Sequence, residues 1–266
     1  MGIRKAKYPI LDFDDDPSAV ILPHHDQARL HLPQRAVFAF LGDRVAAYAK
    51  EVGARKVGSF ESATKDFEVF VIDHKGTELC LCQAPVGASA ATQLLDWLIG
   101  HGVSGVISGG SCGALTELSE GQFLIPSRAL RDEGTSYHYL PPSKFVTLDR
   151  AARRAIKEAM CQHGRVVRDV VSWTTDGFFR ETRAMIEYRK SVGCEVVEME
   201  CASLAACARA RGALFGMLLY TADSLVGETH DPRDWGRCAA DVALPILLDA
   251  AALISIDKIN IKGDHI

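Results

Sequence analysis

Long apolar runs, basic clusters and the P-loop motif are absent from this sequence of 266 residues. No uninterrupted apolar stretch reaches the roughly 18–20 residues that a membrane-spanning helix needs, so we expect no membrane partner. The formal net charge is −4 and no run of Lys and Arg stands out, which argues against a nucleic-acid partner. Gly-Lys-Ser/Thr does not occur, which excludes a P-loop, and the glycines at 109–113 do not have the spacing of the dinucleotide fingerprint.

Cysteine pairs typical of metal sites are also missing, although the chain has eight cysteines. None of them forms Cys-x-x-Cys or a Cys/His spacing of a zinc site. Most lie in apolar segments, where we expect small buried thiols in a reducing, cytoplasmic compartment. The acidic segment from Asp12 to Asp16 is unlike the apolar core of a signal peptide. The sequence therefore predicts neither a metal nor an organic cofactor.

Strand-like apolar segments alternate with amphipathic helical segments along most of the chain. Strands are predicted at 37–41, 67–71, 79–82, 103–107, 166–173, 195–197 and 214–220, and helices before Gly102 and at 148–162, 181–190, 201–210 and 239–256. This order predicts one α/β domain over residues 1–266, with a mostly parallel or mixed central sheet and helices on both faces. Residues 1–34 show little periodicity and are predicted to form an extended N-terminal arm.

Acidic side chains stand where two predicted strands end, and ligands of α/β proteins bind at such ends. Glu198 and Glu200 flank Met199 at the change from a strand to a helix. Two carboxylates can bind a metal or accept hydrogen bonds from sugar hydroxyls, and no nearby histidine or further acid completes a metal site. Sugar hydroxyls are therefore the favoured partners. The alternative for Glu200 is an acid that the helix dipole stabilises at a helix N-terminus.

Asp223 follows the strand predicted at 214–220 and is the second acidic position. A carboxyl group at a partly buried strand end can act as a proton donor near neutral pH. The alternative is an aspartate that caps a helix or makes a turn. Together with the two glutamates, Asp223 suggests a sugar site beside a proton donor.

Two glycine-containing segments that follow predicted strands could bind an anion. Residues 109–113, with Ser111, offer backbone amides and a hydroxyl group. Gly42 is followed by Asp43 and Arg44, whose guanidinium can grip a phosphate. Either segment alone can equally be an ordinary turn. Farther along the chain, Phe178 and the next aromatic residue could stack on a flat ring or pack in the core.

Taken in order, these segments resemble the nucleoside phosphorylase/uridine phosphorylase family, which includes the hexameric-type purine nucleoside phosphorylases. The matching segments are 42–44, 85–89, 109–115, 175–182, 197–200 and 222–223. The resemblance implies a single α/β domain with a mixed, twisted central sheet, in homodimers or homohexamers whose active sites lie at a dimer interface. It implies an enzyme of the pentosyltransferase type, in which phosphate attacks the anomeric carbon of a nucleoside and gives ribose 1-phosphate and a free base.

The resemblance also implies a role for each matching residue. Met199 and Glu200 would hold the ribose with Glu198 close by, and Asp223 would protonate a purine at N7. The remaining assignments are Phe178 and Arg180 to the base, His25 (or His24) of a neighbouring subunit to the ribose 5′-hydroxyl, and Gly42, Arg44, Lys65 and Ser111 to phosphate.

The phosphate site departs from the family pattern at three positions. Ser108 stands where the family usually carries an arginine, Arg44 follows Asp43 without the usual spacing, and Lys65 replaces an arginine lent by the neighbouring subunit. Because of these departures two alternative functions remain: a nucleosidase that uses water in place of phosphate, and a protein that binds nucleosides without catalytic activity. A purine substrate is favoured over a uridine preference, because Asp223 suits N7 and no Gln-x-Arg pair follows the aromatic residues.

Overall fold

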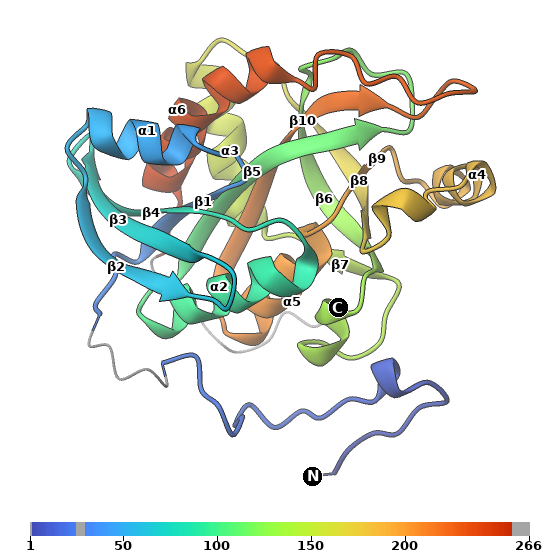
Figure 1. The fold of residues 1–266 in the computed structure, drawn as a ribbon, viewed down its shortest axis with the longest axis horizontal. Coiled ribbons are helices and arrows are strands. Elements are labelled where there is room, and N and C mark those ends of the chain that lie inside the picture. Colours follow the sequence, from blue (N-terminus) through green and yellow to red (C-terminus); the bar gives the residue numbers. More distant parts are fainter. Residues whose placement is uncertain (1, 25–29, 257–266) are drawn as a thin grey trace.

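A computed structural model describes residues 2–24 and 30–256 of the chain. Ten strands of these residues form one sheet (Figure 1). Its strands are β1 (Arg35–Ala39), β2 (Arg55–Glu61), β3 (Asp66–His74), β4 (Thr77–Gln83), β5 (Gly105–Ala114), β6 (Phe123–Asp132), β7 (Phe145–Thr147), β8 (Arg168–Thr175), β9 (Val196–Glu198) and β10 (Leu214–Ser224). The helices are α1 (Arg44–Glu51), α2 (Ala88–Gly100), α3 (Arg150–Gln162), α4 (Arg183–Ser191), α5 (Cys201–Ala210) and α6 (Arg237–Leu253), with 3₁₀ turns η1 (Pro9–Leu11), η2 (Thr135–His138) and η3 (Phe178–Arg180).

The sheet mixes parallel and antiparallel pairs around the long strand β5. This strand pairs in parallel with β1 and β10 and antiparallel with the short β9. One apolar core lies between the sheet and helices α2 and α5, and a second one lies between the sheet and α1, α3 and α6. The predicted α/β class, with a mixed central sheet and helices on both faces, is therefore confirmed. None of the helices in the described ranges is both long and apolar enough to span a bilayer.

The glycine-rich segment 109–113 belongs to β5, which corrects the prediction that it is a turn after the strand. Close packing on both faces of the sheet explains the glycines. A Cβ atom on Gly109 would lie 2.7 Å from the side chain of Leu247, and one on Gly110 would lie 2.8 Å from that of Phe40. Larger residues would force the helix or the neighbouring strand away, so the glycines serve packing here.

Strand β10 also extends beyond its predicted end at Tyr220 and includes Asp223. Its register against β5 shifts between Thr221 and Asp223. A change of register alters the direction in which the following side chains point. Asp223 is therefore an irregular strand position rather than a residue after the strand.

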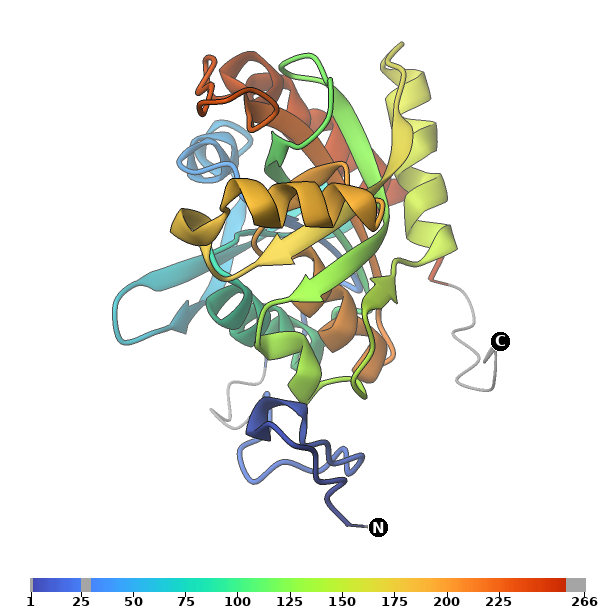
Figure 2. The ribbon, with the colours of Figure 1, turned by 90° about the vertical axis from the view of Figure 1, so that its right-hand side faces the viewer.

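Residues 2–24 run below the η2 turn (Figure 2) and pair with no strand of the sheet. Apart from η1, their regular pairing is a single antiparallel bridge between Arg4 and Phe13. Several of their apolar side chains are exposed, for example Ile3, Tyr8 and Ile21.

A buried aspartate in α6 connects three distant parts of the fold. Asp249 accepts hydrogen bonds from His74 at 2.7 Å, Lys75 at 2.5 Å and His163 at 2.8 Å. Burial by itself raises the pKa of Asp249, but these three donors outweigh burial and lower it to about 2. The cluster joins α6 to the β3–β4 turn and to the end of α3.

We expect Asp249→Asn to lower the free energy of unfolding at pH 7 by about 2 kcal/mol. The pKa in the folded state is below the unfolded value, so this stabilisation is present above about pH 4 and is lost as pH falls toward 2. Urea unfolding at pH 7 and pH 3 measures the difference. The matched control is Asp241→Asn in the same helix, since Asp241 pairs with Arg44 at the surface and is expected to change stability by less than about 1 kcal/mol. Equal effects of the two variants would contradict the prediction.

Candidate active site

A cavity of about 210 Å³ lies where β5, β9 and β10 end. Its walls come from the second half of β5, the β9–α5 junction, the end of β10 and the η3 turn. The lining residues are Phe40, Val86, Gly110, Ser111, Cys112, Gly113, Phe178, Glu181, Val197, Glu198, Met199, Glu200, Met217, Ala222, Asp223, Leu225 and Trp235. The fold thus brings together residues 198–200, which are predicted to hold the ribose, the predicted acid Asp223 and the predicted base-stacking ring of Phe178.

Glu198 is fully engaged in holding the start of α5. One carboxylate oxygen accepts from Ser172 at 2.7 Å and Thr174 at 2.6 Å. The other accepts from the backbone N–H groups of Glu200 at 2.7 Å and Cys201 at 2.6 Å. Burial raises the pKa of Glu198, and these hydrogen bonds oppose that rise. Glu200 does occupy the N-cap position of α5, as the alternative for it proposed, but its side chain makes no capping hydrogen bond; the carboxylate that accepts from the N–H groups there belongs to Glu198.

Glu200 keeps acceptor capacity directed at the cavity. It is 6% exposed, and one of its oxygens accepts from the backbone N–H of Gly87 at 2.6 Å. Burial, reinforced by the charge of Glu198, raises the pKa of Glu200 to about 8. Gly87 has a φ of 98°, a left-handed conformation that favours glycine and turns its N–H toward the carboxylate.

Asp223 meets a histidine that the sequence analysis did not select. Its Oδ2 lies 2.8 Å from Nε2 of His230, while the Asp223 side chain itself is 10% exposed. His230 belongs to the segment between β10 and α6, for which no regular element was predicted. Nothing in the local sequence indicates the contact, because it depends on how this segment returns to the end of β10.

Glu181 and Trp235 also line the cavity and were not predicted. Burial, followed by the charge of Asp223, raises the pKa of Glu181 to about 7. A helix is predicted at 181–190, but α4 begins later, at Arg183, and Thr182 caps it by accepting from the backbone N–H of Met185 at 3.3 Å. Recognising Thr182 as a capping residue would have left Glu181 outside the helix and able to face a ligand.

The two residues predicted to contact the base are placed differently. Phe178 lines the cavity, is 46% exposed and packs edge-on against Phe179. Arg180 is exposed and is not among the lining residues. The neighbouring Arg183 donates to the backbone oxygens of Leu225 and Gly227.

The predicted phosphate residues do not converge in this chain. Ser111 lines the cavity, whereas Gly42, Arg44 and Lys65 do not. Arg44 pairs with Asp241 of α6 at 2.7 Å. Lys65 lies on the β2–β3 hairpin, 5.3 Å from the centre of the Phe67 ring, and was expected to act in a neighbouring subunit.

The charge of the cavity is therefore one-sided. Four carboxyl groups line it, and no Lys or Arg side chain of residues 2–24 or 30–256 does. Ser108, which stands where the family pattern has an arginine, is buried and donates to the backbone oxygen of Phe38 at 2.7 Å. His25 lies outside the described residues. Among the residues that are described, no group of three or more His, Cys, Asp or Glu side chains is placed to hold a metal ion.

Comparison with known proteins agrees with the fold and the motif order. Residues 34–243 match the model of the phosphorylase superfamily. A protein named guanosine phosphorylase from Halorubrum lacusprofundi is 23% identical over 171 residues, which cover 64% of this chain and 71% of that protein.

Two solved structures share the fold. An AMP nucleosidase from Bacteroides thetaiotaomicron has a TM-score of 0.67 and 23% identity, covering 85% of this chain and 91% of the other. A purine nucleoside phosphorylase from Toxoplasma gondii in complex with immucillin-H has a TM-score of 0.73 and 16% identity, covering 88% and 97%. Since the family model covers most of the sequence, this chain belongs to the phosphorylase superfamily, the nucleoside phosphorylase family that its motifs predicted.

Proposed function

We propose that this protein cleaves the N-glycosidic bond of a purine nucleoside. The observation that supports this most is the cavity that brings the Asp223 and Glu200 carboxyl groups together beside the exposed face of Phe178. In this proposal Phe178 stacks on the base. Glu200 accepts hydrogen bonds from the ribose hydroxyls, and Met199 packs against the sugar.

The chemistry follows from where charge develops as the bond breaks. The ribose becomes like an oxocarbenium ion and the base takes the bonding electrons. Asp223 gives a proton to N7, so the base leaves as a neutral molecule. The carboxylates around the sugar favour the positive charge that grows on it, because the cavity is shielded from water.

Water is the acceptor that the described cavity favours. A phosphate dianion needs cations to balance its charge in a buried site, and no Lys or Arg of residues 2–24 or 30–256 lines the cavity. A neutral water molecule needs no such cation. The name of the Bacteroides structure, AMP nucleosidase, is consistent with a hydrolytic member of this fold.

Phosphorolysis is the second candidate. The relative named guanosine phosphorylase and the family itself favour it. In that case a second copy of the chain supplies Lys65, a cation that the cavity lining of the described residues does not include. Ser111 and the backbone amides near it then contact the phosphate.

Release of free base with and without phosphate distinguishes the two candidates. We expect guanosine, inosine and adenosine to lose their base at nearly the same rate in about 50 mM phosphate as in the same concentration of sulfate. A difference of less than about twofold would mean that phosphate takes no part in the transition state. The sugar product should be ribose, detected as a reducing sugar. A phosphate-dependent rate with ribose 1-phosphate as product would establish the second candidate. No release from any purine nucleoside would contradict the proposed function as a whole.

A further inference from the structure

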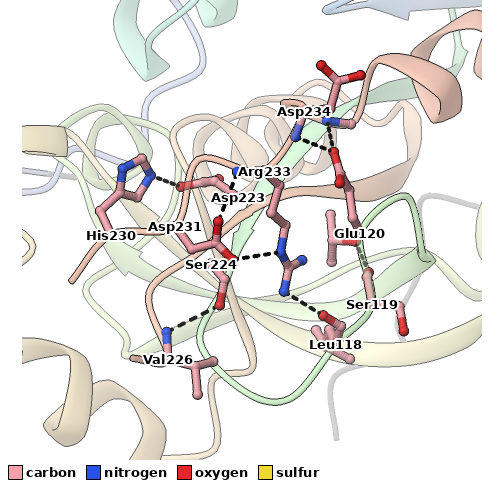
Figure 3. A network of polar contacts seen from close by, with 12 residues as sticks. Leu118, Ser119, Glu120, Asp223, Ser224, Val226, His230, Asp231, Arg233 and Asp234 are labelled. Carbon is pink, nitrogen blue, oxygen red and sulfur yellow. Dashed lines mark hydrogen bonds and ion pairs between the residues drawn. The ribbon is translucent and has the colours of Figure 1, made fainter. Parts of the chain in front are cut away.

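The segment of residues 225–236 joins β10 to α6 and is fastened on both sides (Figure 3); we call it the 225–236 loop. At its start, Ser224 and Asp231 exchange backbone hydrogen bonds of 2.9 and 3.0 Å. At its end, the carboxylate of Glu120 accepts from the backbone N–H groups of Asp234 and Gly236, both at 2.9 Å. The loop is thus held against the β5–β6 connection.

The fastening fixes His230 over the predicted acid. In Figure 3 the imidazole points toward Asp223, and Nε2 lies 2.8 Å from Oδ2. The two side chains differ in access to water, since His230 is 45% exposed and Asp223 only 10%. Trp235, which lines the cavity, lies beside the imidazole with ring centres 5.7 Å apart.

Arg233 is the nearest alternative cation in the loop, and the structure commits it elsewhere. Its guanidinium donates to the backbone oxygen of Leu118 at 2.9 Å and lies 3.8 Å from the carboxylate of Asp231 (Figure 3). Among the described residues, the hydrogen bond that reaches the carboxylate of Asp223 comes from His230. A histidine is also the side chain whose ordinary titration falls between pH 5 and 8.

We infer that His230 is a positioning residue for Asp223 and that the pair carries one transferable proton. This inference rests on the proposed function. When the proton is on His230, the pair is an ion pair that fixes the carboxylate beside the cavity. When it is on Asp223, it can pass to N7 as the glycosidic bond breaks. The transfer leaves an ionised Asp223 and a neutral His230, and solvent returns a proton to the exposed imidazole.

Other titratable groups around the pair shape the expected pH dependence. Glu181 faces Asp223 from the segment after η3, and Cys112 faces it from β5. Burial raises the pKa of the Cys112 thiol well above its usual range, so it stays neutral. Glu181 titrates near neutral pH, so a control variant has to distinguish its effect on the pH dependence of kcat from that of His230.

The test compares kcat and KM for base release from guanosine between pH 5.5 and 9 in three variants. His230→Ala removes the imidazole and is expected to lower kcat at least tenfold while KM changes less than about threefold. His230→Gln can still donate to Asp223 but cannot titrate, so it should recover part of kcat. In the wild-type protein we expect kcat to fall as pH rises through the range of an imidazole, and this fall should be absent in His230→Gln. Glu181→Gln is the control variant, and its kcat should still fall as pH rises.

Each outcome bears on the inference. If His230→Gln keeps the fall in kcat and Glu181→Gln loses it, Glu181 is the titrating group and the inference is overturned. An unchanged kcat in His230→Ala, with the folded state checked by circular dichroism, overturns it as well. In both cases the wild-type protein still releases base, so the proposed function stands. A wild-type protein that releases no base overturns the function and the inference together.

Discussion

Asp223→Asn is expected to lower kcat for base release from guanosine or inosine by at least about 100-fold, the usual loss when a general acid is removed. Asparagine has the same shape but cannot give a proton to N7, so the base would have to leave as an anion. The strand position of Asp223 and its packing against Gly113 are compatible with the amide. KM should change little, because the carboxyl acts mainly after the bond begins to break. Steady-state kinetics with the purified variant measures both constants.

A substrate that needs no proton provides the control for this prediction. The base of 7-methylguanosine already carries a positive charge at N7 and leaves without protonation. We expect Asp223→Asn to cleave 7-methylguanosine at a rate within about fivefold of the wild-type protein. Acid catalysis, which contributes about 100-fold with guanosine, contributes nothing to the cleavage of this substrate. An equal loss on guanosine and 7-methylguanosine would mean that Asp223 positions the substrate and does not act as an acid.

Glu200→Gln is expected to weaken nucleoside binding and to stabilise the protein at high pH. Replacing one of the two carboxyl oxygens available to the ribose hydroxyls by an NH₂ group, which cannot accept, should raise the dissociation constant at least tenfold, equivalent to about 1.5–3 kcal/mol. Burial and then Glu198 raise the pKa of Glu200 to about 8, above the value near 4.5 expected for the unfolded chain. Stability from the neutral form is therefore complete below about pH 4.5 and is lost as pH rises through 8. The variant stays neutral, so at pH 9 it should gain on the order of 5 kcal/mol over the wild-type protein and gain nothing at pH 4.5.

The neighbouring glutamate gives a control with the opposite sign. Glu198 accepts four hydrogen bonds, two of them from backbone N–H groups at the start of α5. Glutamine has one accepting oxygen, and its NH₂ group cannot accept, so Glu198→Gln should leave two of these buried donors unpaired and lower the melting temperature at every pH. Thermal unfolding at pH 4.5 and pH 9 compares the two variants. A melting temperature that Glu200→Gln lowers at pH 9 would contradict the assigned environment of Glu200.

The order of the elements and the candidate acids could be predicted from the sequence by itself. Apolar periodicity is a local signal, and it placed α5 at the residues where the structure has it. The hairpin around Lys75 and Gly76 has a local cause too, because both residues adopt positive φ angles that suit a tight turn. Glu198, Glu200 and Asp223 were found because acidic groups at the ends of apolar strands are unusual, and Met199 was assigned by the family resemblance.

Tertiary structure alone decided which partner each polar group meets. Arg44 follows a strand, as a phosphate-binding residue would, yet it pairs with Asp241, which is 197 residues away in the sequence. Glu198 and Glu200 look equivalent in the sequence, but Ser172 and Thr174 on the adjacent strand occupy only Glu198.

The 225–236 loop shows the same limit. No periodicity marks His230, and its contact with Asp223 exists because the loop is fastened to Glu120 in the β5–β6 connection. The physical reason is range: backbone propensity and apolar spacing act over a few residues, whereas the partner of a buried charge depends on which distant segments pack together. The sequence by itself determined the elements, the family and the candidate acids, and packing decided which of these acids is free to meet a substrate.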